Sequence, residues 1–467
     1  MSNVRDMTRG NPTKLILTFA LPLMLGNLGQ QLYMVVDTII VGQGVGVNAL
    51  AALGATDWIN WMILWMVHGF TQGFAILVAQ HFGAGNYGMV KKSIAMSAIL
   101  TVVIGSALTV TGVLIAGPML RLLNTPVDIY DGANAYLTTI FAGTLVVMAY
   151  NMTAAILRAL GNGKTPLVAM VIAAVINVGL DLLFVIVFGW GIVGAAVATV
   201  IAQFISFVYC FAVIRKIDAV RPEKADWKVD RPLMGRMLKL GTPLGLQQGI
   251  IAVGGMVLQS VINGLGFLFV AGFTATNKLY GLLESTAIAF GYSMTTYTGQ
   301  NLGAKKLHRV EEGMKSVLKL SVIISVAISV AMILFGRGLL GLFVSSAEAN
   351  AAEVLDIAYR YLVIMSMFLL SLYLLHAYRS ALQGLGNAIG PMVSGIIEFA
   401  MRVTAALAFP LLMGETGIFY AEIAAWVGAA IYLIFAYYRE MRKLKHKLNM
   451  EMRQCPGTCA PVLDESV

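Results

Sequence analysis

The chain alternates between long apolar segments and short polar ones. Apolar runs of about 20 residues or more are long enough to cross a bilayer as helices, and twelve such runs can be marked along the sequence. Their approximate bounds are 15–42, 49–80, 89–117, 131–158, 165–188, 191–214, 240–263, 268–300, 314–340, 351–382, 389–412 and 416–438. The pattern predicts an all-α integral membrane protein with twelve transmembrane helices.

The second half of the chain repeats the first. "ALPLMLGNLGQQ" matches "GTPLGLQQGII", which aligns Pro22 with Pro243, and "AQHFGAGN" matches "GQNLGAKK". "LRALGNGKTP" at 157–166 likewise matches "LQGLGNAIGP" at 382–391. Each repeat holds six spans, so both insert with the same orientation. Transporters built from such parallel repeats carry the substrate path between the two halves.

This repeat defines the expected domains. We expect an N-terminal six-helix lobe at 1–214, a cytoplasmic linker at 215–239, a C-terminal six-helix lobe at 240–440 and a basic, then flexible, cytoplasmic tail at 441–467. The two lobes should enclose a central cavity. A monomer would suffice for this arrangement, because the interface between the lobes is internal to the chain.

Basic residues indicate the orientation in the membrane. An even number of spans places both termini on one side, and most of the 32 Lys and Arg residues fall on that side. Arg158 and Arg379 are counted there as loop residues. Because cytoplasmic loops are enriched in Lys and Arg, both termini are predicted to be cytoplasmic. The expected location is the cytoplasmic (inner) membrane of a bacterium or archaeon.

Composition supports a membrane protein and argues against several other classes. The chain is 58% hydrophobic and only 12% charged, against about 25% charged in soluble domains. Its net charge of +9 follows from topology and does not suggest nucleic acid. Three cysteines make no disulfide framework, and the tail motif "CPGTC" is a weak metal signal. "GNGKT" at 161–165 lacks the first glycine of a phosphate-binding loop, so no ATP site is predicted.

Four oxygen-bearing side chains lie at similar depth in the N-terminal lobe. From a rise of about 1.5 Å per residue, Asp37 lies about 8 Å from the outer end of its helix, Asp181 about 10 Å and Thr199 about 12 Å. Asn177 is one turn from Asp181 on the same face. These hard oxygen ligands suit Na⁺, and the two carboxylates could equally share a proton. The alternative is that each polar group only caps or cross-links helices.

The C-terminal lobe has its own intramembrane charges. Glu398 and Arg402 are four residues apart on one span, so an ion pair between them is the simplest interpretation. A gating or substrate role is the alternative. Glu284 lies near the middle of its span, where it could face the central cavity.

The motifs resemble one known family. "LPLMLGNLGQQLYMVVDTIIVGQ", "AQHFGAGN", "LRALGNGKTPL" and "INVGLDLLF" are similar to segments of prokaryotic multidrug and toxic compound extrusion (MATE) transporters, and the resemblance covers about residues 10–440. It implies two six-helix lobes in a V shape. It also implies export of bulky, often cationic or amphipathic compounds by antiport with Na⁺ or protons.

The resemblance also implies roles for individual residues. The cation site of this branch maps onto Asp37, Asn177, Asp181 and Thr199, and Pro22 corresponds to the proposed hinge of the first helix. Another branch of the family carries its carboxylates in the C-terminal lobe. The corresponding positions here are approximately Ile251 and Leu372. Only Glu284 and Glu398 are deep enough to replace those acids.

Three polar or flexible side chains in the N-terminal lobe are candidates for contact with a substrate. Gln30, Met34 and Asn151 are the expected substrate contacts, with ordinary helix packing as the alternative. A lipid-linked glycan or lipid flippase on a related two-lobe fold would need a strongly basic central groove. An enzyme would need a catalytic or metal-binding motif, and we find none. We therefore predict a transporter of small organic molecules, with no cofactor beyond a coupling ion, H⁺ or Na⁺.

Overall fold

The structure, a computed structural model, describes residues 4–342 and 350–454, without the side chains at 32–35, 47, 50, 267 and 451–454. All regular elements among the described residues are helices, which confirms the all-α prediction. The α-helices are α1 (Pro12–Gly44), α2 (Val47–Gly83), α3 (Tyr87–Leu122), α4 (Val127–Ala142), α5 (Thr144–Ala159), α6 (Lys164–Asp181), α7 (Gly191–Arg215), α8 (Arg231–Asn263), α9 (Phe267–Gly303), α10 (Leu307–Leu340), α11 (Ala351–Met367), α12 (Leu369–Gly384), α13 (Ile389–Met413) and α14 (Tyr420–Gln454). A π-helix, η1 (Leu182–Val187), and two 3-10 helices, η2 (Lys224–Trp227) and η3 (Glu415–Phe419), complete the set.

The long helices correspond to the predicted spans. Within the described residues, nine helices are long and apolar enough to cross a membrane, or eleven when two bent pairs each count as one span. The pairs are α4 with α5, bent by 47°, and α11 with α12, bent by 50°. The remaining predicted span corresponds to α9, which has 37 residues but a less apolar sequence.

Two helices extend furthest beyond their predicted spans. α8 begins at Arg231, so the end of the segment predicted as linker is helical. The Asp230 side chain accepts a hydrogen bond of 3.0 Å from the Leu233 backbone N–H, and a proline follows in the first turn. This aspartate–proline start is a helix N-terminus signal. At the other end of the chain, α14 continues to Gln454.

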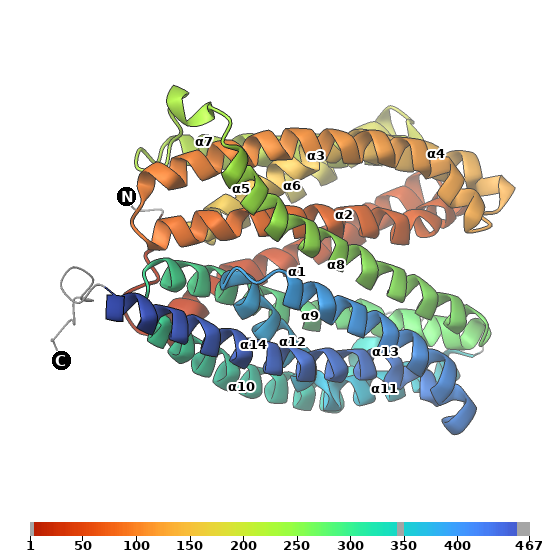
Figure 1. The fold of residues 1–467 in the computed structure, drawn as a ribbon. Coiled ribbons are helices and arrows are strands. Elements are labelled where there is room, and N and C mark those ends of the chain that lie inside the picture. Colours follow the sequence, from red (N-terminus) through yellow and green to blue (C-terminus); the bar gives the residue numbers. More distant parts are fainter. Residues whose placement is uncertain (1–3, 343–349, 455–467) are drawn as a thin grey trace.

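The helices form two lobes, with α2–α7 in the upper part of Figure 1, α9–α14 in the lower part, and α1 and α8 running between them. The first helix of each repeat also contacts the opposite lobe. Ile16 and Phe19 of α1 belong to the hydrophobic core of the C-terminal lobe. Met237 and Leu244 of α8 belong to the core of the N-terminal lobe. The two repeats are therefore joined by reciprocal packing of their first helices.

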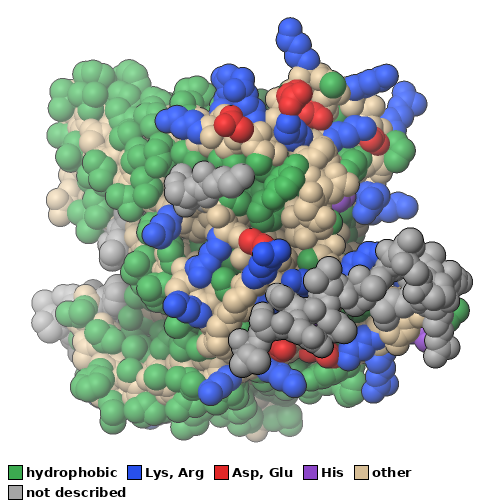
Figure 2. Space-filling view, turned by 90° about the vertical axis from the view of Figure 1, so that its left-hand side faces the viewer, with side chains coloured by type: hydrophobic (Ala, Val, Ile, Leu, Met, Phe, Trp, Pro, Cys, Tyr) green, Lys and Arg blue, Asp and Glu red, His purple; other side chains and the backbone are tan. Residues whose placement is uncertain are grey.

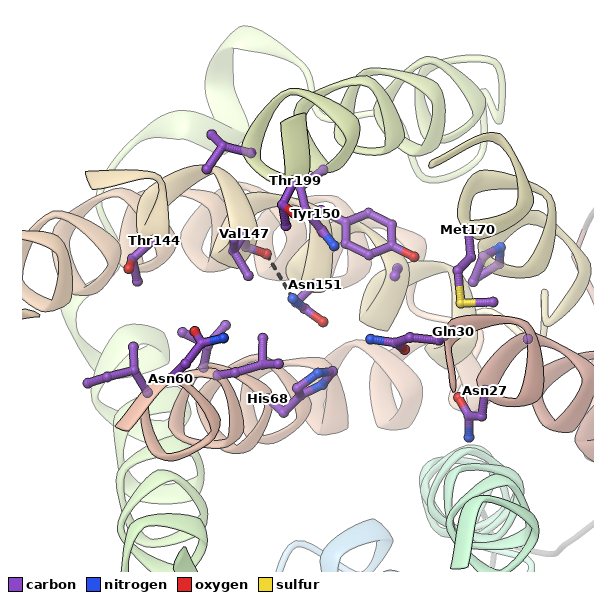
Figure 3. A pocket seen from close by; sticks show the side chains of 18 of the residues that line it. Asn27, Gln30, Asn60, His68, Thr144, Val147, Tyr150, Asn151, Met170 and Thr199 are labelled. Carbon is purple, nitrogen blue, oxygen red and sulfur yellow. Dashed lines mark hydrogen bonds between the residues drawn. The ribbon is translucent and has the colours of Figure 1, made fainter. Parts of the chain in front are cut away.

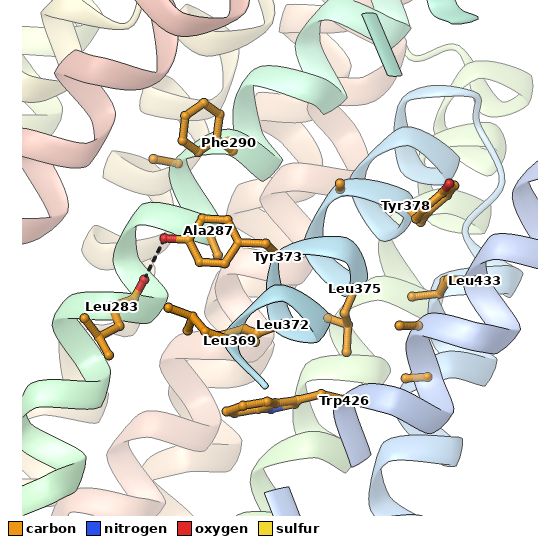
Figure 4. Packing of buried hydrophobic residues seen from close by; sticks show 14 of the residues in the cluster. Leu283, Ala287, Phe290, Leu369, Leu372, Tyr373, Leu375, Tyr378, Trp426 and Leu433 are labelled. Carbon is orange, nitrogen blue, oxygen red and sulfur yellow. Dashed lines mark hydrogen bonds between the residues drawn. The ribbon is translucent and has the colours of Figure 1, made fainter. Parts of the chain in front are cut away.

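The C-terminal lobe has an apolar interior between α9, α12 and α14 (Figure 4). Leu372 and Trp426 are each 2% exposed there. The Tyr373 hydroxyl donates a hydrogen bond of 3.5 Å to the Leu283 carbonyl, so even the phenol is satisfied locally. Leu372 therefore lies within the apolar cluster of the C-terminal lobe.

Lysine and arginine side chains gather at one end of the molecule, which we call the basic end. The described chain begins at Val4 and ends at Gln454 at this end, on the left of Figure 1. Figure 2 views it directly and shows many basic side chains there, while the flanks are largely apolar. Both ends of the described chain thus lie on the basic side of the helical bundle.

The two lobes meet at the basic end through matching hydrogen bonds. The Gln80 side-chain amide of α2 donates to the Gly384 carbonyl of α12 at 3.0 Å. The Gln300 amide of α9 donates to the Ala159 carbonyl of α5 at 2.9 Å. Gln80 and Gln300 are equivalent positions of the repeat, and so are Ala159 and Gly384. Each lobe therefore gives the other the same donor and the same acceptor.

Two equivalent glycines allow the backbones to approach this closely. A β-carbon on Gly83 would overlap the backbone of Gln300, and one on Gly303 would overlap the backbone of Gln80. Only glycine fits at both positions without displacing the opposite helix. The motifs "AQHFGAGN" and "GQNLGAKK" thus mark the contact that closes the basic end.

Candidate cation and substrate site

The four polar residues predicted for the N-terminal lobe come together. α1 supplies Asp37, α6 supplies Asn177 and Asp181, and α7 supplies Thr199. Asp181 is 0% exposed and Asn177 is 1% exposed, while Asp37 is half-buried. The Asn177 amide donates to the Thr199 hydroxyl at 3.4 Å. The Asp37 and Asp181 side chains interact directly.

Four acceptor oxygens of this cluster have no hydrogen-bond donor among the described residues. Oδ1 of Asp37, Oδ1 of Asn177 and both carboxylate oxygens of Asp181 are buried without a partner among the described residues. An unsatisfied buried acceptor costs about 1–3 kcal/mol, and two buried carboxylates repel each other. Hard oxygen ligands favour hard cations. The cluster therefore fits a shared proton or a bound Na⁺.

A π-helix follows this cluster directly. α6 ends at Asp181, and η1 continues the chain over six residues, Leu182–Val187. π-Helical segments often occur at functional sites. The sequence "LLFVIV" carries no residue type that would reveal it, so sequence reasoning missed this feature.

A central cavity of about 170 Å³ borders the cluster (Figure 3). Asp37 and Thr199 lie on its wall, so the cation cluster and the cavity are continuous. Gln30 and Asn151, predicted as substrate contacts, also line it, and the Asn151 amide donates to the Val147 carbonyl at 2.8 Å. The Met34 side chain lies outside the described residues.

Further polar residues line the cavity that sequence reasoning had not assigned to a substrate site. They include Asn27, Asn60, His68, Tyr150 and Gln203. Asn27 falls within the quoted motif of the first span, but nothing in that motif assigns it a role, and the other four belong to no motif. Their shared wall appears only when α1, α2, α5 and α7 are assembled.

Pro22 also lies on the cavity wall, inside a continuous α1. A proline within a helix lacks the N–H needed for the hydrogen bond to the residue four positions earlier. The helix is therefore weakened at this point. The proposed hinge role of Pro22 stays a prediction.

Two arginines that the sequence analysis assigned to loops lie inside the protein. Arg158 is 8% exposed in the last turn of α5 and borders the cavity. Arg379 is 7% exposed within α12. Counting basic residues finds the correct side of the membrane on average. It does not place individual residues at the ends of helices, where part of the last turn can face inward.

The expected ion pair between Glu398 and Arg402 is not formed. Glu398 pairs with Arg379 of α12. Arg402 pairs with Glu422 of α14, at 2.8 Å, and also donates to the Ile251 carbonyl at 3.2 Å. The i, i+4 spacing identifies only neighbours on the same helix. The packing of α13 against α12 and α14 brings other charged side chains closer to Glu398 and Arg402.

Glu284 completes the charged group of the C-terminal lobe. Its carboxylate lies 3.9 Å from Nε2 of His376. Glu284, Glu398 and Arg402 are absent from the residues that line the central cavity. The polar site predicted for this lobe is thus made of ion-paired and histidine-paired side chains, unlike the N-terminal cluster.

Known proteins match this chain in both of its repeats. The MatE family model matches residues 22–183 and 243–407. The probable multidrug resistance protein YpnP of Bacillus subtilis is 30% identical over 421 residues, which cover 88% of this chain and 92% of YpnP.

Solved structures share the fold. An outward-facing multidrug resistance MATE family transporter of the MOP superfamily superposes with a TM-score of 0.88, at 24% identity over 96% of this chain and 99% of that one. A MOP superfamily transporter from Pyrococcus furiosus also gives a TM-score of 0.88, at 24% identity over 94% and 98% of the two chains. That protein is described as having a binding pocket of reverse polarity, which suggests a different function for it.

Proposed function

The chain belongs to the MATE family of multidrug efflux transporters, and from this membership we propose that it is a secondary active antiporter. It would export amphipathic organic compounds in exchange for H⁺ or Na⁺. The observation that carries this proposal is the cluster of Asp37 and Asp181, which borders the central cavity through Asp37. A coupling ion and a substrate would bind there within reach of each other.

The arrangement of the cluster supports a simple exchange mechanism. Two buried carboxylates without a counter-charge favour binding of a cation. Neutralising the pair would let α1 and α6 approach each other, and α1 is easiest to bend at Pro22. Movement of α1 would narrow the cavity, so that cation binding and substrate release would be linked. The substrate would then leave before the cation continues inward.

The position of the basic end supports the direction of transport. We infer that this end faces the cytoplasm of a prokaryotic cell, because cytoplasmic loops are rich in Lys and Arg. The lobe contact at Gly83 and Gly303 would then close the cytoplasmic side. The cavity would accordingly be in the state that exchanges substrate with the outside.

Gradient-driven dye transport in proteoliposomes tests the proposal. Ethidium movement should follow an imposed proton or Na⁺ gradient, and the ion that drives it identifies the coupling ion. Asp37→Asn and Asp181→Asn should reduce gradient-driven transport to the level of protein-free liposomes. Asp57→Asn, an exposed acid elsewhere on α2, is the matched control and should transport normally. Full transport by both cluster variants would refute the coupling role.

A further inference from the structure

Arg158 places a positive charge inside the central cavity. It lies in the last turn of α5 and is 8% exposed. It borders both the central cavity and a smaller hollow next to it, which Gln72, Thr295 and Thr296 also line. The guanidinium is therefore positioned where α2, α5 and α9 meet, at the inner side of the cavity.

In the part of the chain that the structure describes, no carboxylate neutralises this charge. Among the described residues, none lies within ion-pair distance of Arg158, and its Nε has no hydrogen-bond partner. Its one aromatic contact is Tyr292 of α9, whose ring centre is 4.7 Å from the guanidinium carbon. Arginine stays charged in proteins, and an unpaired buried charge is costly. The two buried arginines of the C-terminal lobe, in contrast, each have a glutamate partner.

The surroundings of Arg158 match a substrate with one anionic group. Tyr292 fixes the guanidinium plane by stacking. A planar guanidinium can bind carboxylate or phosphate oxygens through two parallel hydrogen bonds. The cavity wall beyond it combines apolar residues, such as Ile63, Leu64 and Val67, with uncharged polar ones. Asp37 of α1, the acid that lines the cavity, belongs to the cation cluster.

We propose that Arg158 binds an oxyanion, carboxylate or phosphate, carried by an otherwise apolar or aromatic substrate in the central cavity. This inference rests on the proposed function and narrows its substrate class. A compound with a positive body and a carboxylate would fit better than the same compound with the carboxylate esterified. The proposed site thus selects zwitterionic and anionic amphipaths over simple cations.

Binding of a matched dye pair tests this selectivity directly. Rhodamine 110 has a free carboxylate, and rhodamine 123 is its methyl ester. Fluorescence anisotropy with the full-length protein in nanodiscs should show tighter binding of rhodamine 110. Arg158→Gln should weaken rhodamine 110 binding about tenfold or more, the usual effect of losing a charge-assisted hydrogen bond, and leave rhodamine 123 binding unchanged. Arg158→Lys should restore part of the preference.

A surface arginine provides the matched control. Arg215 lies in the last turn of α7 as Arg158 lies in the last turn of α5, and it also stacks on an aromatic ring, Phe211, but it is exposed. Arg215→Gln should bind both dyes like the unmodified protein. Equal loss of both dyes in Arg158→Gln and Arg158→Lys would assign Arg158 a structural role and overturn the proposal. Equal binding of the two dyes by the unmodified protein would overturn it as well.

A second pair distinguishes the two oxyanions. Flavin mononucleotide differs from riboflavin by one phosphate, so preferential binding of the mononucleotide that depends on Arg158 identifies phosphate. Preference for rhodamine 110 alone identifies carboxylate. These are binding measurements, so their outcome does not depend on gradient-driven transport. Absence of gradient-driven transport together with binding that depends on Arg158 would contradict the proposed antiport and leave the anion site in place.

Discussion

The buried charges of this protein fall into two groups, those with an oppositely charged partner and those without one. Arg379 and Arg402 of the C-terminal lobe each contact a glutamate, Glu398 and Glu422. Asp37 and Asp181 of the N-terminal lobe face each other without a cation from the described chain. Charges inside a membrane are costly, so they are usually paired or functional. The paired ones therefore stabilise the fold, and the unpaired ones are where a ligand can act.

The first prediction concerns a paired charge. Glu398→Gln leaves Arg379 buried without its counter-ion, and breaking one side of a buried pair costs about 3–5 kcal/mol. The thermal unfolding midpoint of the purified protein in detergent should fall clearly. The double variant Arg379→Met/Glu398→Leu should recover part of the loss, because it removes both charges.

An exposed ion pair serves as the control for this experiment. Arg337 and Asp356 approach to 2.7 Å, but their side chains are 55% and 49% exposed. Asp356→Asn should change stability by less than about 1 kcal/mol. An equal effect of Asp356→Asn and Glu398→Gln would contradict the argument from burial.

The site residues that could be predicted from the sequence are those defined by their depth along a helix. Asp37, Asp181 and Thr199 could be found because depth along a helix follows from counting residues. Arg158 and the partner of Glu398 could not. Their environments depend on which helices pack together, and hydropathy carries no information about that packing. Local spacing therefore predicts depth well and long-range partners poorly.

Helices are interrupted where hydropathy alone shows continuous spans. α4 and α5 bend at Gly143, and α11 and α12 bend at Phe368. Each pair was predicted as one span, because an apolar run does not reveal a change of direction. The linker before α8 was predicted from its charged residues, and two of these, Glu223 and Asp230, form ion pairs with Lys91 and Lys92 of α3.

The close crossing of α2 and α9 gives a prediction for lobe movement. Gly83→Ala or Gly303→Ala would place a methyl group against the opposite backbone. The conformation in which the two lobes touch at the basic end should then be less populated. Distances between spin labels on the two lobes at this end should lengthen. Gly235→Ala is the control, since its β-carbon meets no atom within 4 Å. Unchanged distances in both interface variants would refute the role of this contact.

The linker gives a prediction for pH. A hydrogen bond from Lys92 lowers the pKa of Asp230 below its usual 3.8, and one from Lys91 lowers the pKa of Glu223 below its usual 4.5. Groups with lowered pKa stabilise the fold above their unfolded pKa and lose this effect as the pH falls through the folded value. The protection factors of the linker amides, which compare observed exchange with the intrinsic rate at each pH, should therefore fall below about pH 4.

One variant separates the ion pair from the helix cap. Asp230→Asn keeps an oxygen for the Leu233 N–H but cannot pair with Lys92, whose ammonium lies 2.6 Å from the carboxylate. It should raise linker exchange already at neutral pH and weaken the acid response. Asp218→Asn, at an exposed position of the same linker, should leave both unchanged. Identical profiles for the two variants would count against the ion pair.

At the scale of the whole molecule, charge and repeat organise the protein together. Basic side chains gather at the end where the described chain begins and ends (Figure 2). The two lobes follow from the repeat, which was visible in the sequence because its polar loop motifs stay in register. The exchange of α1 and α8 between lobes was not visible, since an apolar face does not identify its partner.

Orientation in the membrane gives the last prediction. In a background without Cys210, Cys455 and Cys459, Lys224→Cys should react with an impermeant maleimide only after cells are opened. Asp128→Cys, at the opposite end, should react in intact cells. Both positions are exposed, so access alone decides the result. The reverse labelling pattern would place the basic end outside.

The matched contact of Gln80 and Gln300 has a consequence for the origin of the protein. Each half carries both the donor and the acceptor, so the surface is self-complementary, as in a symmetric homodimer. Two copies of one six-helix ancestor could associate through it before their genes were joined. Fusion of the two genes would allow the halves to diverge. Only one of them kept or acquired the aspartate pair, a specialisation that two identical subunits cannot have.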